Sequence, residues 1–374
     1  MADPDRDTVE IDGRRVRLTH PEKVMYPSTG TTKRDVVDYV VAVAPLVVRH
    51  GAGRPATRKR WPDGVGTAQD PGQSFFAKDL PGSVPHWVPR REQQHADHVN
   101  TYPLPDDAAT LAWFVQMGTL EIHVPQWRFG PAARQELPPD RLVLDLDPGE
   151  GAGLAECVEV ARLLRPRLDD LGLTSVPVTS GSTGVHVYAG LDGSATSDEV
   201  AEAAARLARE MAEEHPDLVV STIRRDVRRG KVLIDWSQNR AARTTVTPYS
   251  MRGRTRPTVA VPRSWDELED ADLRQLTIDE VLERVRDVGD PMDVIAPLEG
   301  RAGTRHGAAM PVEEDGDAGT TEDGTGTGTT GDGTGTGRYE DRTVAELRRR
   351  ARDLGLRGYS DLRKAELVDL LRNH

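Results

Sequence analysis

The chain has 374 residues, a formal net charge of -12 and one cysteine, Cys157. This length can hold one large or two medium domains and a tail. A single cysteine excludes an intrachain disulfide framework and a zinc site made of cysteines, so carboxylates, histidines or phosphates must hold any metal. No apolar run approaches the roughly 18 residues of a membrane span, and the N-terminus is charged, which together predict a soluble cytoplasmic protein.

The first fifty residues predict a hairpin followed by a helix. Residues 9–18 alternate apolar and polar side chains around Asp12-Gly13, a turn dipeptide. A threonine at position 31 or 32 is placed to cap a helix that we expect to continue to about residue 49. Lys23 precedes this helix and Lys33 lies in its first turn, and taken singly both fit ordinary solvated lysines.

Basic and aromatic residues mark the next segment. Residues 54–64 are strand-like and contain three consecutive basic residues, including Lys59, which suit contact with phosphate or form a solvated edge. Phe75 and Phe76 are adjacent and therefore face opposite ways on a strand, so we expect one of them in the core. An exposed ring beside a lysine would be a base-stacking platform, and core packing of both rings is the alternative.

Residues 108–124 predict a buried helix that leads into an alternating strand. His123 lies on the polar phase of this strand. It is either a residue that contacts a ligand or a surface histidine.

Asp145 and Asp147 stand at the end of a buried strand. The strand's other residues from Leu142 to Leu146 are branched and apolar, Pro148 ends the strand, and alternate residues share a face, so the two carboxylates point together. Two anions this close repel each other unless a cation lies between them, and a divalent metal prefers such hard oxygen ligands. The alternative is a turn whose aspartates cap the following helix.

A loop rich in glycine and hydroxyl residues occupies residues 180–188, with His186 at the start of the next strand. Its backbone N–H groups can turn towards an anion, which is the chemistry of a phosphate cradle. The lysine and the spacing of a P-loop are absent. Helices are predicted on both sides of this loop, at 154–171 and 196–214, the second with a capping box.

Residues 231–236 form a second apolar strand that ends in an acid, Asp235. A third carboxylate at a strand end completes the ligand set of a two-metal phosphoryl-transfer site. No acid occurs from residue 237 to residue 265, whereas this segment holds six arginines, which suit bidentate phosphate contacts. They are Arg240, Arg243, Arg252, Arg254, Arg256 and Arg263. An acidic focus beside a basic stripe indicates a metal-dependent enzyme that acts on nucleic acid.

The composition changes near the end of the chain. Residues 301–337 consist largely of Gly, Thr, Asp and Glu, which predicts a flexible acidic linker. Seven acids and no base lie between Glu313 and Asp332, so over half of the net charge belongs to this segment. Residues 339–374 predict a separate two-helix module.

In combination these motifs resemble the polymerase domain of bacterial DNA ligase D, a member of the archaeo-eukaryotic primase superfamily. The resemblance covers about residues 15–295. Its motifs are Asp-Leu-Asp-Pro at 145–148, Ser-Gly-x-x-Gly-x-His at 180–186, Asp-Trp-Ser-Gln-Asn at 235–239 and Tyr-Ser-x-Arg at 249–252. The implied fold is α/β of the primase-polymerase type, with mixed β-sheets flanked by helices.

The resemblance also implies an activity and its partners. The chain would be a template-directed, ribonucleotide-preferring nucleotidyltransferase that uses two Mn²⁺ or Mg²⁺ ions to fill gaps at DNA ends in non-homologous end joining. Its substrates would be NTPs and DNA ends with a 5′-phosphate, at the nucleoid. The sequence holds no Lys-x-Asp-Gly ligase motif, so a separate DNA ligase and a Ku-like protein are the expected partners.

Individual residues take roles from the same resemblance. Asp145, Asp147 and Asp235 would be the catalytic metal ligands. The nucleotide would contact Ser180, His186, Arg252, Gln238 and His123, with Lys59 as a further basic contact. The DNA would contact Lys23 and Lys33 through its 5′-phosphate, and Phe75 and Phe76 by stacking. Thr183 departs from the pattern, because many members have a phosphate-contacting lysine there, and we expect weaker triphosphate affinity.

The tail resembles small helical modules of the SAP type and of the N-terminal part of the Rho terminator, which implies nucleic-acid binding. A protein-docking helical hairpin is the alternative. The expected organisation is therefore a primase-polymerase domain over residues 1–298, a linker over 299–337 and a small helical module over 338–374.

Two other functions fit the same residues. A stand-alone primase-like polymerase of replication or damage tolerance would share the active site and differ at the 5′-phosphate pocket of Lys23 and Lys33. A non-catalytic nucleic-acid scaffold would use the basic stripe and the tail, and Asp145→Ala would leave it unchanged.

Overall fold

The computed structural model describes residues 8–295, together with Leu347 and Lys364. The chain falls into two units, residues 1–314 and 315–374, and all the helices and strands with defined bounds belong to the first. The predicted linker and the predicted C-terminal module lie outside the described residues, apart from those two positions. Within the described part of the chain, no helix has the length and apolar character needed to cross a membrane.

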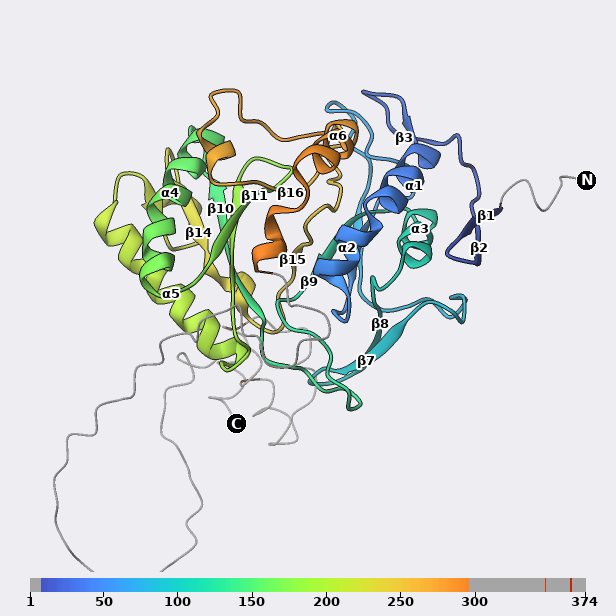
Figure 1. Cartoon of the computed structure of the whole chain (residues 1–374), viewed down its shortest axis with the longest axis horizontal. Helices are drawn as coiled ribbons and strands as arrows, with labels where there is room; N and C mark the ends of the chain where they lie inside the picture. Colours follow the sequence, from blue (N-terminus) through green and yellow to red (C-terminus); the bar gives the residue numbers. More distant parts are fainter. Residues whose placement is uncertain (1–7, 296–346, 348–363, 365–374) are drawn as a thin grey trace, which may run out of the picture. The chain divides into compact units, whose positions relative to one another are not determined.

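The larger sheet has six strands in the order β13-β14-β10-β12-β11-β16. Its strands are β10 (Arg141–Pro148), β11 (Ser175–Thr179), β12 (Val185–Gly190), β13 (Val219–Val220), β14 (Val232–Asp235) and β16 (Val261–Pro262). β13 and β14 are parallel and the other neighbours are antiparallel, so the predicted mixed sheet is confirmed. Two helices, α4 (Leu154–Asp170) and α5 (Ser197–Glu214), cover one face of this sheet (Figure 1).

Side-chain periodicity explains which face α4 and α5 cover. Leu142, Leu144 and Leu146 alternate along β10 and pack in one core cluster with the apolar residues of both helices. The start of α5 is fixed by the predicted capping box, since Thr196 accepts from the N–H of Glu199 at 3.3 Å and the Glu199 carboxylate accepts from the N–H of Thr196 at 2.7 Å.

The second sheet has four antiparallel strands in the order β15-β9-β5-β6. They are β5 (Thr57–Arg60), β6 (Phe75–Ala77), β9 (Thr119–Val124) and β15 (Thr245–Val246). Three helices pack against it: α1 (Lys33–Ala42), α2 (Ala44–Gly51) and α3 (Ala108–Gln116), which lie on the opposite side of the view from α4 and α5 (Figure 1). Leu120, Ile122 and Val124 of β9 point into this core, so the alternate residues of the strand point away from the helices.

The single helix that we predicted from residue 31 or 32 to residue 49 is two helices. Thr32 is the N-cap of α1, which ends at Ala42 with Val43 as its C-cap. Pro45 stands at the start of α2, where its missing N–H breaks no helical hydrogen bond. A continuous helix would have placed Pro45 in its interior, which costs about 3 kcal/mol or more.

Smaller elements complete the described part of the chain. The predicted N-terminal hairpin is confirmed as β1 (Thr8–Ile11) and β2 (Arg14–Arg17), with positive φ angles of 49° at Asp12 and 70° at Gly13 in its turn. The others are β3 (Val24–Tyr26), β4 (Thr31–Thr32), β7 (Arg90–Gln94), β8 (Val99–Pro103), α6 (Ile278–Val288) and the 3₁₀ turns η1 (Arg225–Val227), η2 (Trp236–Asn239), η3 (Asp266–Glu269) and η4 (Pro291–Val294).

The free faces of the two large sheets meet in a third core cluster. Val143 of β10 and Tyr188 of β12 lie in it together with Val246 of β15. The Tyr188 hydroxyl also donates to the carbonyl of Val246 at 3.3 Å. The face of β10 that carries Val143 therefore looks towards the second sheet, and Asp145 and Asp147 are in phase with Val143.

Candidate active site

A row of three polar residues crosses the middle of the six-stranded sheet. Asp145 of β10 pairs with His186 of β12 on one side and with Asp235 of β14 on the other. Directly opposed residues of antiparallel strands project to the same face, and so does Asp147, two residues further along β10. The fold thus brings the three predicted carboxylates together with the predicted histidine.

Two of these carboxylates are held by neighbouring groups. Nε2 of His186 lies 3.3 Å from Oδ1 of Asp145. Oδ1 of Asp235 accepts from the N–H and the hydroxyl of Ser237, at 2.9 Å and 2.6 Å, and Oδ2 accepts from Nε2 of Gln238 at 3.1 Å. With the side chains so placed, no three His, Cys, Asp or Glu residues of the described chain are grouped to hold a metal ion. Binding a metal through all three aspartates would require these side chains to turn.

The electrostatics of the row favour a cation. Burial, and then the charge of Asp145, raise the pKa of Asp147 to about 6. Burial also opposes ionisation of Asp145, but the charges of His186 and Arg252 outweigh it and hold the pKa of Asp145 below its usual value. A divalent cation would relieve the repulsion that raises the pKa of Asp147, so the donor set fits a metal in its chemistry.

His186 retains one unused polar atom. Its side chain is buried, and Nδ1 has no hydrogen-bond partner among the described residues. Buried polar atoms are nearly always paired in folded proteins. This nitrogen is therefore available to a group bound beside Asp145.

The loop that starts at Ser180 is closed on itself and is not the open cradle that we predicted. The Ser180 hydroxyl accepts from the N–H groups of Ser182 and Gly184, both at 3.2 Å. The N–H of Gly181 donates to Oε1 of Gln275 at 2.6 Å. Three N–H groups expected to face an anion are thus engaged within the protein.

This closed loop holds a neighbouring arginine instead. Gly181 has a φ of +70°, and a Cβ there would lie 2.6 Å from Cγ of Arg252, so glycine permits the close approach. Nη1 of Arg252 donates to the carbonyl of Ser180 at 2.6 Å. Nη2 of Arg254 donates to the hydroxyl of Ser182. The loop therefore holds Arg252 beside the site and Arg254 at the surface.

One buried carboxylate, which the sequence analysis missed, joins two of the predicted nucleotide residues. Oε1 of Glu121 lies 3.4 Å from Nε of Arg252, and Oε2 lies 2.8 Å from Nε2 of His123. Burial opposes the charge of Glu121, but the hydrogen bond from His123 and the charge of Arg252 outweigh it, so the pKa of Glu121 lies far below its usual range. The signal was available, because Glu121 and His123 are two residues apart on an alternating strand.

The aromatic pair is exposed at both positions, contrary to our expectation that one ring enters the core. Phe75 is 46% exposed and Phe76 is 58% exposed, because β6 is the edge strand of its sheet. The Arg60 guanidinium lies 5.0 Å from the ring centre of Phe75, and Nζ of Lys59 lies 5.4 Å from that of Phe76. The ring of Phe76 also meets that of His123 edge-on at 5.5 Å, so the platform adjoins the site.

Lys23 and Lys33 are neighbours in the structure. The N–H of Lys33 donates to the carbonyl of Lys23 at 2.8 Å. Lys33 is buried, its Nζ donates to the carbonyl of Thr19 at 2.8 Å, and burial and then the charge of Lys23 lower its pKa. Nζ of Lys23 contacts the carbonyl of Pro62 at 2.7 Å and the carboxylate of Asp63 at 2.8 Å. Two adjacent cations suit an anionic group.

The six arginines of residues 237–265 do not form one basic stripe. Arg263 is buried and pairs with Glu267 at 3.2 Å, and Arg252 is directed into the site. The exposed members are Arg240, Arg243, Arg254 and Arg256. The structure therefore separates the segment into internal and surface cations.

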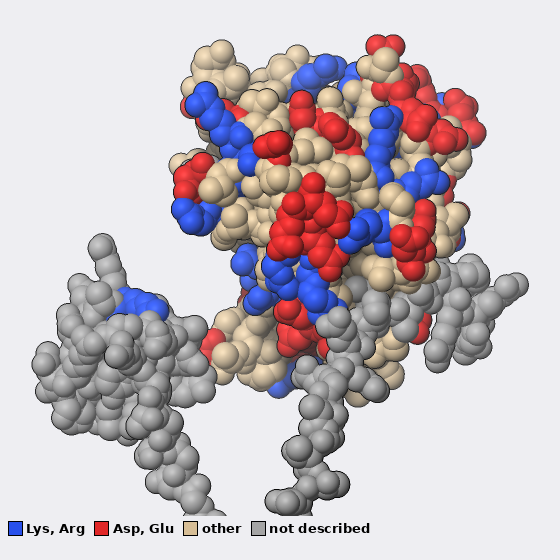
Figure 2. All heavy atoms as spheres, turned by 90° about the vertical axis from the view of Figure 1, so that its left-hand side faces the viewer, with Lys and Arg blue, Asp and Glu red and all other residues tan. Residues whose placement is uncertain are grey.

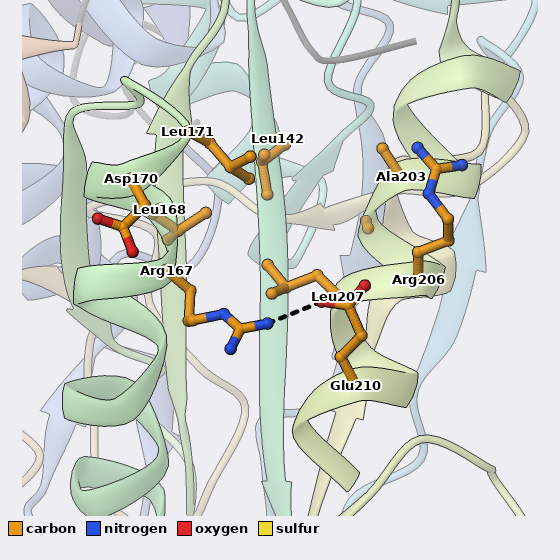
Figure 3. A pocket seen from close by; sticks show the side chains of 10 residues that line it. Leu142, Arg167, Leu168, Asp170, Leu171, Ala203, Arg206, Leu207 and Glu210 are labelled. Carbon is orange, nitrogen blue, oxygen red and sulfur yellow. Dashed lines mark hydrogen bonds and ion pairs between the residues drawn. The ribbon is translucent and has the colours of Figure 1, made fainter. Parts of the chain in front are cut away.

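The side of the six-stranded sheet opposite the aspartates, covered by α4 and α5, carries charges of both signs and a hollow lined by leucines. Figure 2 looks onto the side where α4 and α5 lie and shows acidic and basic side chains interspersed. Arg167 of α4 pairs with Glu210 and Glu214 of α5, both at 2.9 Å. A hollow of about 260 Å³ lies between these helices and is lined by leucines (Figure 3). One of them, Leu142, lies on the face of β10 that points away from the aspartates. This hollow is not part of the candidate site.

Comparison with known proteins decides the family. The family model for the LigD primase-polymerase domain matches residues 32–292. The chain belongs to this family. LigD primase-polymerase domains are nucleotidyltransferases, and membership implies metal-dependent catalysis.

Relatives support the assignment over most of the described residues. The multifunctional non-homologous end joining DNA repair protein LigD of Mycobacterium tuberculosis is 49% identical over 295 residues, which are 77% of this chain and 38% of that protein. The bifunctional non-homologous end joining protein LigD of Bacillus subtilis is 29% identical over 279 residues, 74% of this chain and 43% of that protein. The chain thus spans less than half the length of these relatives.

A solved structure agrees with the fold. The polymerase domain from Mycobacterium tuberculosis Ligase D, in complex with DNA, superposes with a TM-score of 0.72 at 49% sequence identity. The match covers 76% of this chain and 99% of that domain. The predicted LigD polymerase family and its α/β fold of mixed sheets and flanking helices are confirmed. The resemblance of the tail to SAP-type modules concerns residues that, apart from Leu347 and Lys364, lie outside the described part of the chain.

Proposed function

We propose that this LigD-family chain is a template-directed polymerase that adds nucleotides, ribonucleotides by preference, at gaps and at DNA ends bearing a 5′-phosphate. Its role would be gap filling in non-homologous end joining. The observation that carries the proposal is the row of His186, Asp145 and Asp235 on the six-stranded sheet, with Asp147 beside it. This row faces the four-stranded sheet, whose Glu121 lies next to Arg252. The names of the relatives and the DNA in the solved structure support it.

Asp145, Asp147 and Asp235 would hold Mn²⁺ or Mg²⁺. When bound, such ions lower the pKa of an attacking hydroxyl and offset the charge of the phosphates during in-line transfer. The protein's own groups bind and orient the nucleotide. The Ser180 carbonyl accepts from Nη1 of Arg252, and the guanidinium held in this way would contact the triphosphate.

Other side chains would contact the nucleotide from both sides. Nδ1 of His186 is available beside Asp145, and Gln238 is tied to Asp235, so both lie next to the proposed metal ligands. His123 lies on the second sheet with Phe76 and Lys59. The nucleotide would therefore sit between the two sheets.

The DNA would contact the surface beside this site. Phe75 and Phe76 offer exposed rings for stacking against bases. Lys23 and Lys33 would take the 5′-phosphate, with Asp63 displaced from Lys23 as the phosphate binds. Sealing of the filled DNA requires a ligase, and we propose that a DNA ligase and a Ku-like end-binding protein act with this chain.

The experiment is nucleotide addition with Mn²⁺ on gapped DNA with and without the 5′-phosphate. Wild type should be stimulated by the phosphate, and a Lys23/Lys33 double alanine should lose the stimulation while it retains addition on unphosphorylated gaps. A matched control removes two exposed arginines of α4 and α5, Arg165 and Arg209, and should behave as wild type. Equal addition by wild type on both gaps would reject the end-joining role and favour a primase-like polymerase.

A further inference from the structure

Glu121 is a buried acid on a face proposed to receive an anion. Its side chain is only 3% exposed, and Lys59 is its cross-strand partner on β5. An unpaired buried carboxylate would be costly, and it would also repel a triphosphate. Its position therefore calls for an explanation in terms of the groups that it contacts.

Both carboxylate oxygens of Glu121 are engaged. Oε1 accepts from the N–H of Gly253 at 3.0 Å and lies 3.4 Å from Nε of Arg252. Oε2 lies 2.8 Å from Nε2 of His123. Glu121 thus contacts two parts of the site. One is the segment that carries the Arg252 guanidinium, and the other is the imidazole of His123 on its own strand, β9.

The contacts restrict Arg252 at two points. Its buried Nε lies 3.4 Å from Oε1 of Glu121, an ion pair in which Nε has no hydrogen-bond partner among the described residues, and its Nη1 donates to the carbonyl of Ser180 at 2.6 Å. The hydrogen bond to Ser180 and the charge of Glu121 together favour one orientation of the planar guanidinium. The backbone is also held, since the N–H of Arg252 donates to the carbonyl of Thr258 at 2.8 Å.

The same carboxylate determines the state of His123. A carboxylate only accepts hydrogen bonds, so the proton must stand on Nε2, and Nδ1 of the neutral ring remains as an acceptor. The ring is also constrained by Phe76, whose centroid lies 5.5 Å away at an interplanar angle of 75°. His123 therefore has one orientation and one available nitrogen.

We propose that Glu121 is a positioning residue of the nucleotide site, which sets Arg252 and His123 together before the nucleotide binds. This inference rests on the proposed function, because it concerns the same site. Preorganised groups bind more tightly since less side-chain freedom is lost on binding. Loss of the Glu121 charge should therefore weaken nucleotide binding and leave the chemical step largely intact.

The test is a double-mutant cycle on the full chain with Glu121→Gln and Arg252→Ala. The readouts are KM and kcat for NTP addition on gapped DNA and the equilibrium affinity for ATP with Mn²⁺. Glu121→Gln keeps the shape of the side chain and should raise KM about tenfold, the loss expected for one charge-assisted contact, with kcat little changed. The double variant should lose less affinity than the sum of the two single losses, because Glu121 acts partly through Arg252 and partly through His123.

A matched control separates positioning from stability. Glu267 is a partly buried carboxylate that pairs with Arg263 at 3.2 Å and Arg284 at 2.5 Å. Glu267→Gln should lower the melting temperature with no change in KM. The ¹⁵N NMR signals of His123 should report a proton on Nε2 in wild type and a changed tautomer balance in Glu121→Gln.

The outcomes distinguish the two proposals. Additive effects in the cycle, a loss confined to kcat, or an unchanged His123 tautomer would overturn the role of Glu121 while wild type remains an active polymerase. Failure of wild type to bind ATP or to add nucleotides would instead reject the proposed function.

Discussion

Asp145 and Asp235 lie directly opposite each other on antiparallel strands β10 and β14, and each carboxylate already has a polar partner on its own side of the pair. His186 faces Asp145, and Ser237 holds Asp235. Among the described residues no side chain holds the Asp147 carboxylate in this way, and its pKa is raised to about 6, by burial first and by the charge of Asp145 second. The arrangement concentrates negative charge at one point between the two sheets.

This concentration predicts metal binding that depends on Asp235. Asp235→Asn removes one hard anionic ligand and should weaken Mn²⁺ affinity at least about tenfold, since even outer contacts of metal sites are worth about 10–100-fold. Free Mn²⁺ can be measured by its EPR signal during titration. Glu202→Gln, on the exposed surface of α5, is the control that removes a carboxylate elsewhere. Equal affinity in the two variants would contradict a role for Asp235.

The exposed aromatic pair predicts a loss of DNA affinity without a loss of stability. Phe76→Ala should weaken binding to gapped DNA by about 1–3 kcal/mol, the range for one stacked base. Because Phe76 is 58% exposed, the melting temperature should stay near that of wild type. Val288→Ala, at a similarly exposed apolar position, is the control. Fluorescence anisotropy would show whether the two variants differ, and equal affinities would argue against stacking.

Glu267 predicts a pH-dependent contribution to stability. Burial raises its pKa, but hydrogen bonds from Arg284 and from the N–H of Ser264 outweigh it and lower the pKa to about 2 from 4.5. A lowered carboxyl pKa stabilises the fold above the unfolded value, and this contribution is lost as the pH falls from 4.5 towards 2. Glu267→Gln should therefore unfold more easily than wild type at pH 7, and denaturant titrations at decreasing pH should show the difference shrinking. A difference that is independent of pH would refute this account.

Cys157 should be unreactive in the folded protein. Burial, and then the charges of Asp147 and Asp145, raise its thiol pKa to about 12, so little thiolate exists at pH 8. Iodoacetamide at pH 8 should leave the native chain unlabelled and should label this sole cysteine once guanidinium unfolds it. Mass spectrometry would measure both, and rapid labelling of the native chain would contradict the burial of Cys157.

Local patterns in the sequence were sufficient to predict the strand that carries Asp145 and Asp147 and the capping box of α5. Period-two alternation fixes which side chains of β10 share a face, so the joint direction of Asp145 and Asp147 was predictable. The pairing of β10 with β14 was not, because strand register between segments far apart depends on tertiary packing. The chemistry of a third acid at a strand end, and then the family resemblance, grouped Asp235 with the other two, and periodicity alone did not.

The errors have physical causes as well. Pro45 divided one predicted helix into two, which its missing N–H should have indicated. The exposure of both Phe75 and Phe76 follows from the edge position of β6, and that position is a property of the whole sheet. Arg263 was counted with surface cations because its partner, Glu267, follows the acid-free segment.

The most direct test of the central claim is nucleotide addition with Mn²⁺ on a gapped DNA, comparing wild type with Asp147→Ala. If the three aspartates form the centre of a polymerase, wild type should extend the primer. The rate of nucleotide addition by the variant should be lower by at least about 10²-fold, as for loss of a major electrostatic contact. Unchanged addition by Asp147→Ala, with both proteins folded, would contradict it.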